Sequence, residues 1–269
     1  MPETIGVIAG ESILPLLSIR EARRQGMITV VAGIRGLTLK AVQGEADCYA
    51  EFSLGEIGKL FRFFLDHSTH RAIMVGRVRH RAIFSLLSVD RKFFKLLKKI
   101  RDKTTTSLLS TIADFFQEEG IEVLDSTTFL KRFLVEEKLY TPKRTLRPAV
   151  TADIEFGWQK AWGIAGLDIG QTVCVKGRAV VAVEAMEGTD RTILRAGEIA
   201  GPGVVAVKVS RPGHDMRFDV PVVGIDTMAT LVKIKAAALV LEAQRTLMLD
   251  GEPFVAMATK NQIGVLGKK

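Results

Sequence analysis

Short apolar runs that alternate with helical patterns are what most restricts the fold of the first half of this chain. Residues 4–9 form an apolar run that ends at Gly10, which is typical of a buried parallel strand. Helical spacing follows over residues 16–25 and ends at Gly26. Further strands are predicted over residues 27–32, 72–76 and 121–124, and helices over 54–67, 90–101 and 105–119, with Ser126 capping one more. This alternation predicts a parallel sheet with right-handed crossovers, as in a Rossmann-like α/β domain.

The second half of the chain has a less regular pattern. Residues 138–149 carry prolines and charges without an apolar period, as linkers do. We therefore expect an N-terminal domain over residues 1–140, a linker over 141–150 and a C-terminal mixed α/β domain over 151–269. The predicted helices of the second half span residues 153–165, 189–199 and 227–244, and its predicted strands span 171–176, 178–184, 204–209, 246–249 and 254–257. The turn at Gly177 favours a hairpin of the first two strands.

The positive charge of the chain is concentrated in one segment. The formal net charge is +8, and residues 71–103 alone contain eleven Lys and Arg against Asp90 and Asp102. Phenylalanines and leucines alternate with lysines there, so a helix in this segment has one apolar and one cationic face. Such a helix can pack on its own core with solvated charges, or contact an anionic membrane surface. Nucleic acid is the weakest alternative, because no known nucleic-acid-binding motif is present.

No segment of the sequence indicates a membrane span or an exported protein. No apolar run reaches the roughly 20 residues that a spanning helix needs, and the amino terminus lacks the basic region of a signal peptide. Cys48 and Cys174 lie far apart without metal-type spacing, so we expect both to be reduced, buried and structural. These features favour a cytoplasmic protein.

Three acid-bearing turns lie between residues 168 and 230, each where a predicted strand ends or a predicted helix begins. They cover residues 187–190, 211–219 and 224–227. Ligands bind at such ends in α/β sheets. Clustered carboxylates suit Mg²⁺, which shares its oxygen ligands with substrate phosphates. Lys208, Arg211 and Arg217 add cations for phosphate oxygens, so the pattern indicates a site for a phosphorylated substrate.

Structural roles remain open for the same residues. An aspartate at the start of a helix is most often an N-cap, and both Asp190 and Asp226 fit that description. Arg217 could form a structural ion pair with a neighbouring aspartate. His214 is the one histidine inside these turns, which makes it a candidate substrate contact.

Residues 6–12 form a glycine-containing turn from the first predicted strand into its helix. The turn resembles a mononucleotide-binding loop through Gly6 and Gly10. It lacks the Gly-x-Gly-x-x-Gly fingerprint and the lysine of a phosphate-binding loop, so a tight turn without a ligand is the alternative interpretation. No Gly-x-Ser-x-Gly motif is present, which disfavours a serine hydrolase.

Four motifs of the second half resemble those of one enzyme family. They are DIGQTVCV at 168–175, VEAMEGTD at 183–190, VKVSRPGHDMRFDVP at 207–221 and VGIDT at 223–227. Their order and spacing resemble the LpxI-type UDP-2,3-diacylglucosamine pyrophosphatases, and a weaker similarity extends over the first half. Two departures are local, since His214 stands where the family commonly has glutamine and Arg211 where it commonly has lysine.

The resemblance implies two α/β domains joined by a linker, with the lipid-linked ligand held between them. It also implies Mg²⁺-dependent hydrolysis of UDP-2,3-diacylglucosamine to 2,3-diacylglucosamine 1-phosphate (lipid X) and UMP, a step of lipid A biosynthesis. The expected location is the cytoplasm, at the inner face of an inner membrane. No nucleic-acid partner is expected, and the oligomeric state is left open, with a homodimer as one option.

Within the matching motifs, the resemblance ranks Asp226 first as a catalytic or metal-associated carboxylate, with Asp190 and Glu187 next. Asp226 and Asp190 are the candidate Mg²⁺ ligands, and which carboxylate binds the metal and which orients water is left open. Substrate contacts are expected from Gly10, Gln171, Gly188, Thr189, Lys208, Arg211, His214, Asp215, Arg217 and Thr227. The alternative is a non-catalytic nucleotide-sugar or lipid-binding regulatory protein, and release of UMP from the substrate separates the two.

Overall fold

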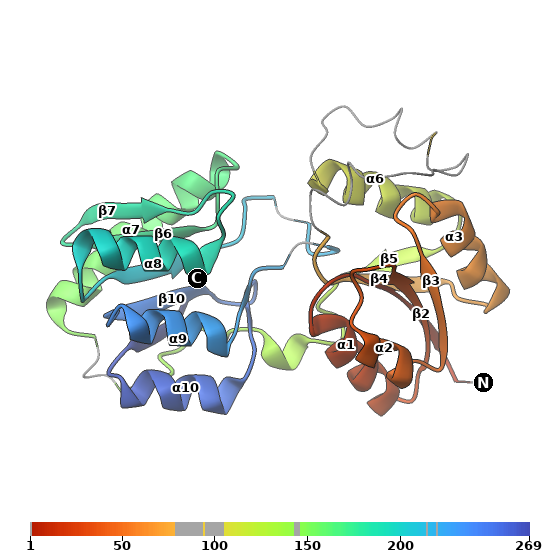
Figure 1. The fold of residues 1–269 in the computed structure, drawn as a ribbon, viewed down its shortest axis with the longest axis horizontal. Coiled ribbons are helices and arrows are strands. Elements are labelled where there is room, and N and C mark those ends of the chain that lie inside the picture. The colour runs from red at the N-terminus through yellow and green to blue at the C-terminus, as the bar shows by residue number, and fades with distance from the viewer. Residues whose placement is uncertain (1, 79–93, 95–104, 143–145, 214, 219) are drawn as a thin grey trace. The chain divides into compact units, whose positions relative to one another are not determined.

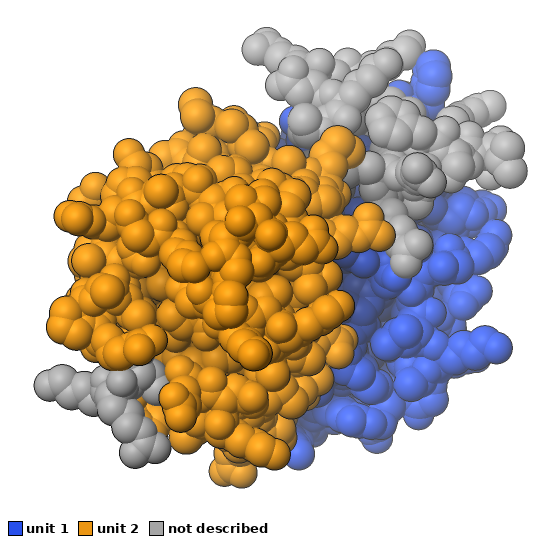
Figure 2. Space-filling view, turned by 60° about the vertical axis from the view of Figure 1, so that its left-hand side comes forward, with its two compact units in different colours: residues 1–131, 215–219 blue, residues 132–214, 220–269 orange. Residues whose placement is uncertain are grey.

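The computed structural model describes residues 2–78, 94, 105–142, 146–213, 215–218 and 220–269. The chain forms two compact units (Figure 2). Unit 1 contains residues 1–131 and 215–219, and unit 2 contains residues 132–214 and 220–269. A short segment of the second half therefore belongs to unit 1, and the chain passes between the units three times.

Unit 1 is built on one parallel sheet. Its strand order is β3-β2-β1-β4-β5, and every neighbouring pair is parallel. The elements in chain order are β1 (Thr4–Ala9), α1 (Leu14–Arg24), β2 (Ile28–Ile34), α2 (Lys40–Glu45), β3 (Cys48–Phe52), α3 (Ile57–Asp66), β4 (Arg71–Val75), α6 (Thr105–Glu118) and β5 (Glu122–Leu124). The predicted Rossmann-like α/β domain is confirmed.

The strand order of unit 1 reverses beside β1, which creates the topological switch point where ligands of such sheets bind. Gly10 follows β1 there and donates its N–H to the carbonyl of Val75 at 2.8 Å. Glu11 and Arg77 then exchange two backbone hydrogen bonds. A Cβ on Gly10 would lie 2.9 Å from the carbonyl oxygen of Arg77, so the close approach of these two turns requires glycine.

The core of unit 1 lies on both faces of this sheet. Figure 1 shows α1 and α2 on one face and α3 and α6 on the other. Between α3 and α6 lies an aromatic cluster whose ring centroids are 5.5 to 6.2 Å apart, formed by Phe61, Phe64, Phe115 and Phe116. Such tilted and edge-to-face contacts stabilise a core beyond the area that they bury.

Residues 215–218 complete unit 1 although they come from the second half of the chain. Phe218 is buried in the aromatic core. Ser126 donates from its backbone N–H and from Oγ to the carbonyl of Met216. Arg217 pairs with Asp215 at 2.6 Å and with Asp114 of α6 at 3.3 Å. The structural ion pair considered for Arg217 is therefore present.

Unit 2 contains a mixed sheet of order β12-β10-β8-β6-β7 and a small parallel pair, β9 with β11. In the larger sheet β8, β10 and β12 are parallel, and β6 runs antiparallel to both of its neighbours. The elements are the 3-10 helix η1 (Lys131–Phe133) at the boundary, α7 (Pro148–Gly166), β6 (Thr172–Lys176), β7 (Ala179–Val183), α8 (Thr189–Ala200), β8 (Val205–Lys208), β9 (Val222–Val223), α9 (Ile225–Lys233), β10 (Ala238–Glu242), β11 (Leu247–Met248), α10 (Gly251–Lys260) and β12 (Gly264–Lys268). The predicted mixed α/β domain and its hairpin of β6 and β7 are confirmed.

Helices cover both faces of the unit 2 sheet. Figure 1 shows α7 on one face and α8, α9 and α10 on the other. α7 packs closely because Gly157 faces the sheet, where a Cβ would lie 2.9 Å from Cγ2 of Val207. On the opposite face Ile193, Met228 and Phe254 are fully buried, one from each of the three helices.

The prediction of one long helix over residues 227–244 is wrong. α9 ends at Lys233, Lys235 adopts a left-handed φ of +51°, and the next residues enter β10. β10 is buried along its whole length because helices cover both faces of its sheet. A continuous apolar run of this kind looks the same in a buried strand and a buried helix, which is why periodicity failed here.

The prediction of a strand over residues 254–257 is also wrong, because α10 occupies them. Phe254 and Ala258 are its buried residues, four positions apart, as one face of a helix requires. Ser126 does not cap a helix, since residues 126–130 form turns in the described structure. The sequence patterns did not indicate α2, β3 or β12.

Most of the basic segment at residues 71–103 lies outside the described residues, so the helix expected at 90–101 and its membrane contact stay predictions. No described helix has both the length and the apolar character needed to cross a membrane. Both cysteines are free thiols. Cys174 is buried as expected, and burial raises the pKa of its thiol to about 12. The expectation for Cys48 is wrong, because its side chain is only partly buried.

Candidate active site

The register of the unit 2 sheet brings three polar residues to one edge. Thr172 at the start of β6 pairs with Lys208 at the end of β8, because these strands are antiparallel. β7 ends at the same edge, where Glu184 donates its N–H to the carbonyl of Thr172 at 2.9 Å. This is the carboxyl edge of the parallel strands, the place where α/β sheets bind ligands.

Lys208 is the centre of a buried polar cluster at this edge. Its Nζ lies 2.8 Å from Oγ1 of Thr189, 3.5 Å from Oγ1 of Thr172 and 3.8 Å from Oε2 of Glu184. Thr189 in turn donates to Oε1 of Glu184 at 3.0 Å. The side chains of Lys208 and Glu184 are only 6% and 12% exposed. A cation and a carboxylate so shielded from water interact far more strongly than a surface pair.

Two helices begin beside this cluster, each with a glycine as its N-cap residue. α8 begins after Gly188, whose φ is +85°, and α9 begins after Gly224. A glycine has no side chain for capping, so neither N-cap residue satisfies the N–H groups of its first turn; in α9 the N–H of Ile225 donates instead to Oδ2 of Asp250 at 3.1 Å. Thr227 of α9 donates from Oγ1 to Oδ1 of Asp190 on α8 at 2.8 Å, so the two helix starts are adjacent.

Asp190 and Asp226 occupy equivalent places in these two helices. Each is the second residue of its helix, after Thr189 and Ile225 respectively. The N-cap interpretation of both aspartates is therefore wrong, since the caps are glycines. Asp226 is exposed and Asp190 is half-buried, so both carboxylates remain accessible at the carboxyl edge.

Glu187 lies in the turn before α8, but its carboxylate is engaged. Oε1 pairs with Arg195 at 2.5 Å and Oε2 accepts the N–H of Ala185 at 3.1 Å. Its own backbone N–H and the guanidinium of Arg195 lower the pKa of Glu187. In the structure Glu187 thus stabilises this turn and lies outside the Lys208 cluster.

The loop that follows β8 is held by a buried carboxylate. Glu242 at the end of β10 accepts from both the N–H and Oγ of Ser210, at 2.6 and 2.7 Å. Arg211 pairs with Asp168 at 2.6 Å. Gln171 accepts the N–H of Val209 through its carbonyl, at 2.9 Å. These bonds place Gln171 and Arg211 at the same edge of the sheet as Lys208.

The structure separates the expected site residues into two groups. Gly10, Asp215 and Arg217 belong to unit 1, and His214 lies outside the described residues. The others lie at or next to the carboxyl edge of the unit 2 sheet, namely Gln171, Glu187, Gly188, Thr189, Asp190, Lys208, Arg211, Asp226 and Thr227.

Sequence reasoning missed Glu184, Thr172, Arg195 and Glu242 as parts of this region. Glu184 had a visible signal, because it is an acid directly after a β-branched strand. Thr172 had none, since its role follows from its pairing with Lys208, 36 residues away.

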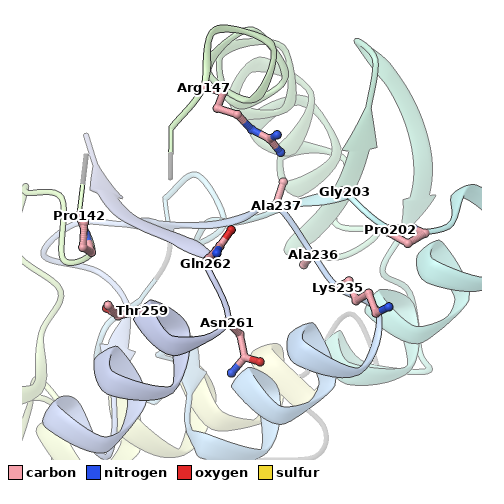
Figure 3. A pocket seen from close by; sticks show the side chains of 10 residues that line it. All are labelled: Pro142, Arg147, Pro202, Gly203, Lys235, Ala236, Ala237, Thr259, Asn261 and Gln262. Carbon is pink, nitrogen blue, oxygen red and sulfur yellow. The ribbon is translucent and has the colours of Figure 1, made fainter. Parts of the chain in front are cut away.

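Unit 2 also has a hollow at the edge of the sheet opposite to the Lys208 cluster. Figure 3 shows this cavity of about 470 Å³, where residues before β8, β10 and β12 meet the ends of α8, α9 and α10. Arg147 and Lys235 supply its charge. Lys235 follows the C-terminus of α9, where a cation is favourable, and Arg147 is the N-cap residue of α7.

Comparisons with known proteins agree on one family over nearly the whole chain. The family model for the LpxI N-terminal domain matches residues 4–133, and that for the LpxI C-terminal domain matches residues 137–266. A relative from Caulobacter vibrioides, UDP-2,3-diacylglucosamine pyrophosphatase LpxI, is 29% identical over 98% of this chain and 96% of its own length.

Solved structures show only distant similarity. The biotin carboxylase domain of a thermophilic 2-oxoglutarate carboxylase is 12% identical, with 75% of this chain and 34% of that chain covered and a TM-score of 0.27. N5-carboxyaminoimidazole ribonucleotide synthetase from Thermotoga maritima is 15% identical, with coverage of 69% and 42% and a TM-score of 0.25. Neither likeness bears on function. The two domain models, in order and end to end, show that this chain belongs to the LpxI family.

Proposed function

We propose that this protein hydrolyses the pyrophosphate bond of UDP-2,3-diacylglucosamine to 2,3-diacylglucosamine 1-phosphate and UMP, in lipid A biosynthesis. The family assignment supports this activity, and the Caulobacter relative carries it in its name. The observation that carries the proposal is the meeting of two glycine-capped helix starts beside a buried lysine.

A diphosphate matches this arrangement because it carries two anionic groups a few ångströms apart. The start of a helix binds a phosphate through free backbone N–H groups and the positive end of the helix dipole. α8 and α9 supply two such starts, linked through Thr227 and Asp190. Gly188 leaves room for phosphate oxygens to approach the backbone, because nothing lies within 4 Å of where its Cβ would be, whereas Oδ2 of Asp250 lies beside Gly224. Lys208 adds a nearby positive charge.

The carboxylates of Asp190 and Asp226 oppose this attraction, and a divalent cation resolves the conflict. No three His, Cys, Asp or Glu side chains in the described part of the chain group closely enough to hold a metal ion. Two carboxylates do fit Mg²⁺, which commonly binds one or two carboxylates and completes its shell with substrate phosphates and water. Asp190 and Asp226 would hold it, and it would neutralise charge on the phosphates.

Unit 1 supports recognition of the nucleotide rather than chemistry. Its switch point is formed by Gly10 and Gly76, which pack against each other at the edge where such sheets bind ligands. Ser12 in the same turn has a φ of 141°, a strained value for a residue with a side chain. Such strain clusters at ligand sites, in keeping with a role of this turn in binding.

The decisive experiment mixes purified protein, UDP-2,3-diacylglucosamine and Mg²⁺ and measures UMP and the lipid phosphate. We expect equal amounts of both products, and loss of turnover with a chelator that Mg²⁺ restores. Binding of the substrate without UMP would favour the alternative of a non-catalytic binding protein. Turnover that a chelator leaves unchanged would remove Mg²⁺ from the proposal and keep the hydrolysis.

A further inference from the structure

The hydroxyl of Thr189 lies between a base and a cation. Oγ1 is 3.0 Å from Oε1 of Glu184 and 2.8 Å from Nζ of Lys208. A third neighbour, Oγ1 of Thr172, is 3.4 Å away. Both charged partners are almost fully buried, whereas Thr189 itself is half-buried and can be reached from the carboxyl edge.

Counting donors and acceptors fixes where the proton of this hydroxyl points. A threonine hydroxyl has one proton to donate and two lone pairs. A lysine ammonium only donates, so Lys208 takes one of those lone pairs. The proton then goes to Glu184, because a carboxylate at 3.0 Å is a stronger acceptor than the neutral hydroxyl of Thr172 at 3.4 Å.

A hydroxyl with its proton directed into the protein cannot donate to a phosphate oxygen. It can offer electrons to phosphorus, with a base already in contact. A nucleophile in hydrogen-bond reach of a base that a third group orients is the arrangement of covalent catalysis. Here Glu184 is the base and Lys208 is the third group. Oε2 of Glu184 is buried without a hydrogen-bond partner among the described atoms, so that carboxylate is not saturated.

The place of Thr189 at the start of α8 supports the same role. It is the first residue of the helix, directly after Gly188, so a phosphoryl group on its Oγ1 would lie beside the free N–H groups of the first turn. Those groups would stabilise the negative charge that develops on the phosphoryl oxygens during transfer.

We propose that Thr189 is the nucleophile of the reaction and that hydrolysis passes through a phosphodiester between Thr189 and the organic group on the phosphorus that is attacked. This proposal rests on the proposed function. Oγ1 of Thr189 bonds to one phosphorus of the diphosphate, the bridging P–O bond breaks, and the other phosphate leaves with that bond's electrons. The hydroxyl proton passes to Glu184 and then to solvent.

A water molecule completes the reaction. Its oxygen bonds to the same phosphorus, the Oγ1–P bond breaks, and one proton of the water restores the hydroxyl of Thr189. The other proton leaves to solvent, so the two products together carry all the atoms of the substrate and the oxygen of one water, and the two displacements release one proton each to solvent. Glu184 acts as base in the first displacement, and Lys208 is a positioning residue that keeps the lone pair of Thr189 directed outward.

The stereochemical course at phosphorus tests this proposal directly. Hydrolysis in ¹⁸O-water first identifies which product gains the label and therefore which phosphorus reacts. A substrate with a chiral phosphorothioate at that position is then hydrolysed by the wild-type protein in ¹⁸O-water, so that the thiophosphate product is chiral. Two successive displacements give retention of configuration, which we expect. One direct attack by water gives inversion, which would overturn the proposal while leaving the proposed hydrolysis intact.

Variants of Thr189 give an independent measurement. Thr189→Val keeps the shape without the hydroxyl, and we expect turnover to fall by roughly 10³-fold or more with substrate affinity within about threefold. Thr189→Ser should retain turnover within about tenfold, since it keeps the nucleophile. The matched control is Thr192→Val, which removes a hydroxyl bonded to Gly188 and Glu187 on the same helix. Equal losses in Thr189→Val and the control would contradict the proposal.

The role of Lys208 is tested by separating kcat from KM. Lys208→Met should lower kcat with KM nearly unchanged if the lysine acts through Thr189. A rise in KM at constant kcat would indicate that Lys208 contacts a substrate phosphate and does not position Thr189. Absence of any UMP from wild-type protein would sink the proposed function itself, which is a different outcome from all of these.

Discussion

At the carboxyl ends of their strands, the two units differ in what they present to a ligand. Unit 1 presents backbone, with Gly10 and Gly76 facing each other over a small apolar hollow of about 40 Å³. Unit 2 presents charge, with Lys208 and Glu184 buried and Asp226 exposed.

The difference teaches that the carboxyl edge of an α/β sheet can serve either binding or chemistry, whichever sheet carries it. Both units place turns and helix starts at the same kind of edge. The residue type at or just after the end of each strand differs, because Gly10 lets two turns of unit 1 pack closely, whereas Lys208 and Glu184 place charge at the edge of the unit 2 sheet. We therefore expect changes in unit 2 to affect turnover and changes in unit 1 to affect affinity or stability.

The largest effect is expected from Asp226→Ala. Losing a carboxylate that acts on the reacting phosphates should lower turnover by roughly 10³-fold, while substrate binding stays largely intact. UMP release measures turnover, and equilibrium binding of the lipid substrate measures affinity. The control is Glu198→Ala, an exposed carboxylate near the other end of α8. Near-normal turnover in a folded Asp226→Ala protein would break the contrast between the units.

Phe218→Ala should destabilise unit 1 although the residue comes from the second half of the sequence. Phe218 is 9% exposed in the core of unit 1. Removal of a buried phenylalanine costs about 3–5 kcal/mol of unfolding free energy. Urea denaturation measures this loss. Leu167→Ala, at a leucine that is 70% exposed, should change stability by about 0.5 kcal/mol or less. Equal stability of the two variants would show that residue 218 is not part of that core.

Gly10→Ala should raise KM more than it lowers kcat. The added Cβ would lie 2.9 Å from a backbone carbonyl, so the two turns at the switch point must separate. Such overpacking costs about 1–3 kcal/mol. Gly44→Ala is the control, because nothing lies within 4 Å of its Cβ. A loss of kcat as large as that of Asp226→Ala would place chemistry in unit 1 as well.

The smallest effect concerns the pH dependence of stability in unit 1. A hydrogen bond from the side chain of Lys59, with others from Ser53, lowers the pKa of Glu56 to about 2. Because the folded pKa lies below the unfolded one of about 4.3, this stabilisation is present above about pH 4.3 and is lost as pH falls towards 2. Glu56→Gln should lower the unfolding free energy at neutral pH by about 1 kcal/mol or less. Unfolding curves of both proteins should converge near pH 2, and a constant difference would contradict the assignment.

Local patterns predicted the elements whose signals lie within a few residues. β1 was identified over its whole length because an apolar run ends at Gly10, and the start of α8 because a helical pattern begins at Thr189. β10 was mistaken for helix because burial on both faces removes the alternation that marks a strand. Both strands are buried, and the difference is that a glycine marks the end of β1 whereas the apolar pattern runs from α9 into β10 without a strong break.

The candidate site was only partly predictable for a related reason. Asp190, Thr189 and Lys208 carry their own signals, as polar residues at the ends of elements. The engagement of Glu187 by Arg195 depends on side-chain geometry across one helical turn and more. The hydrogen bond from Thr227 to Asp190 spans 37 residues and exists only after two helices have packed. The spacing of motifs in the sequence does not predict such side-chain contacts.

The return of residues 215–218 into unit 1 has a consequence for any attempt to divide this protein. A cut between the two family domains, at about residue 135, would give a first fragment without the aromatic ring that fills its interior and without the partner of Ser126. The second fragment would carry Phe218 without the core of unit 1 that buries it. We therefore expect co-expressed halves to become soluble only when they bind each other. The protein should not divide into two independently folding domains.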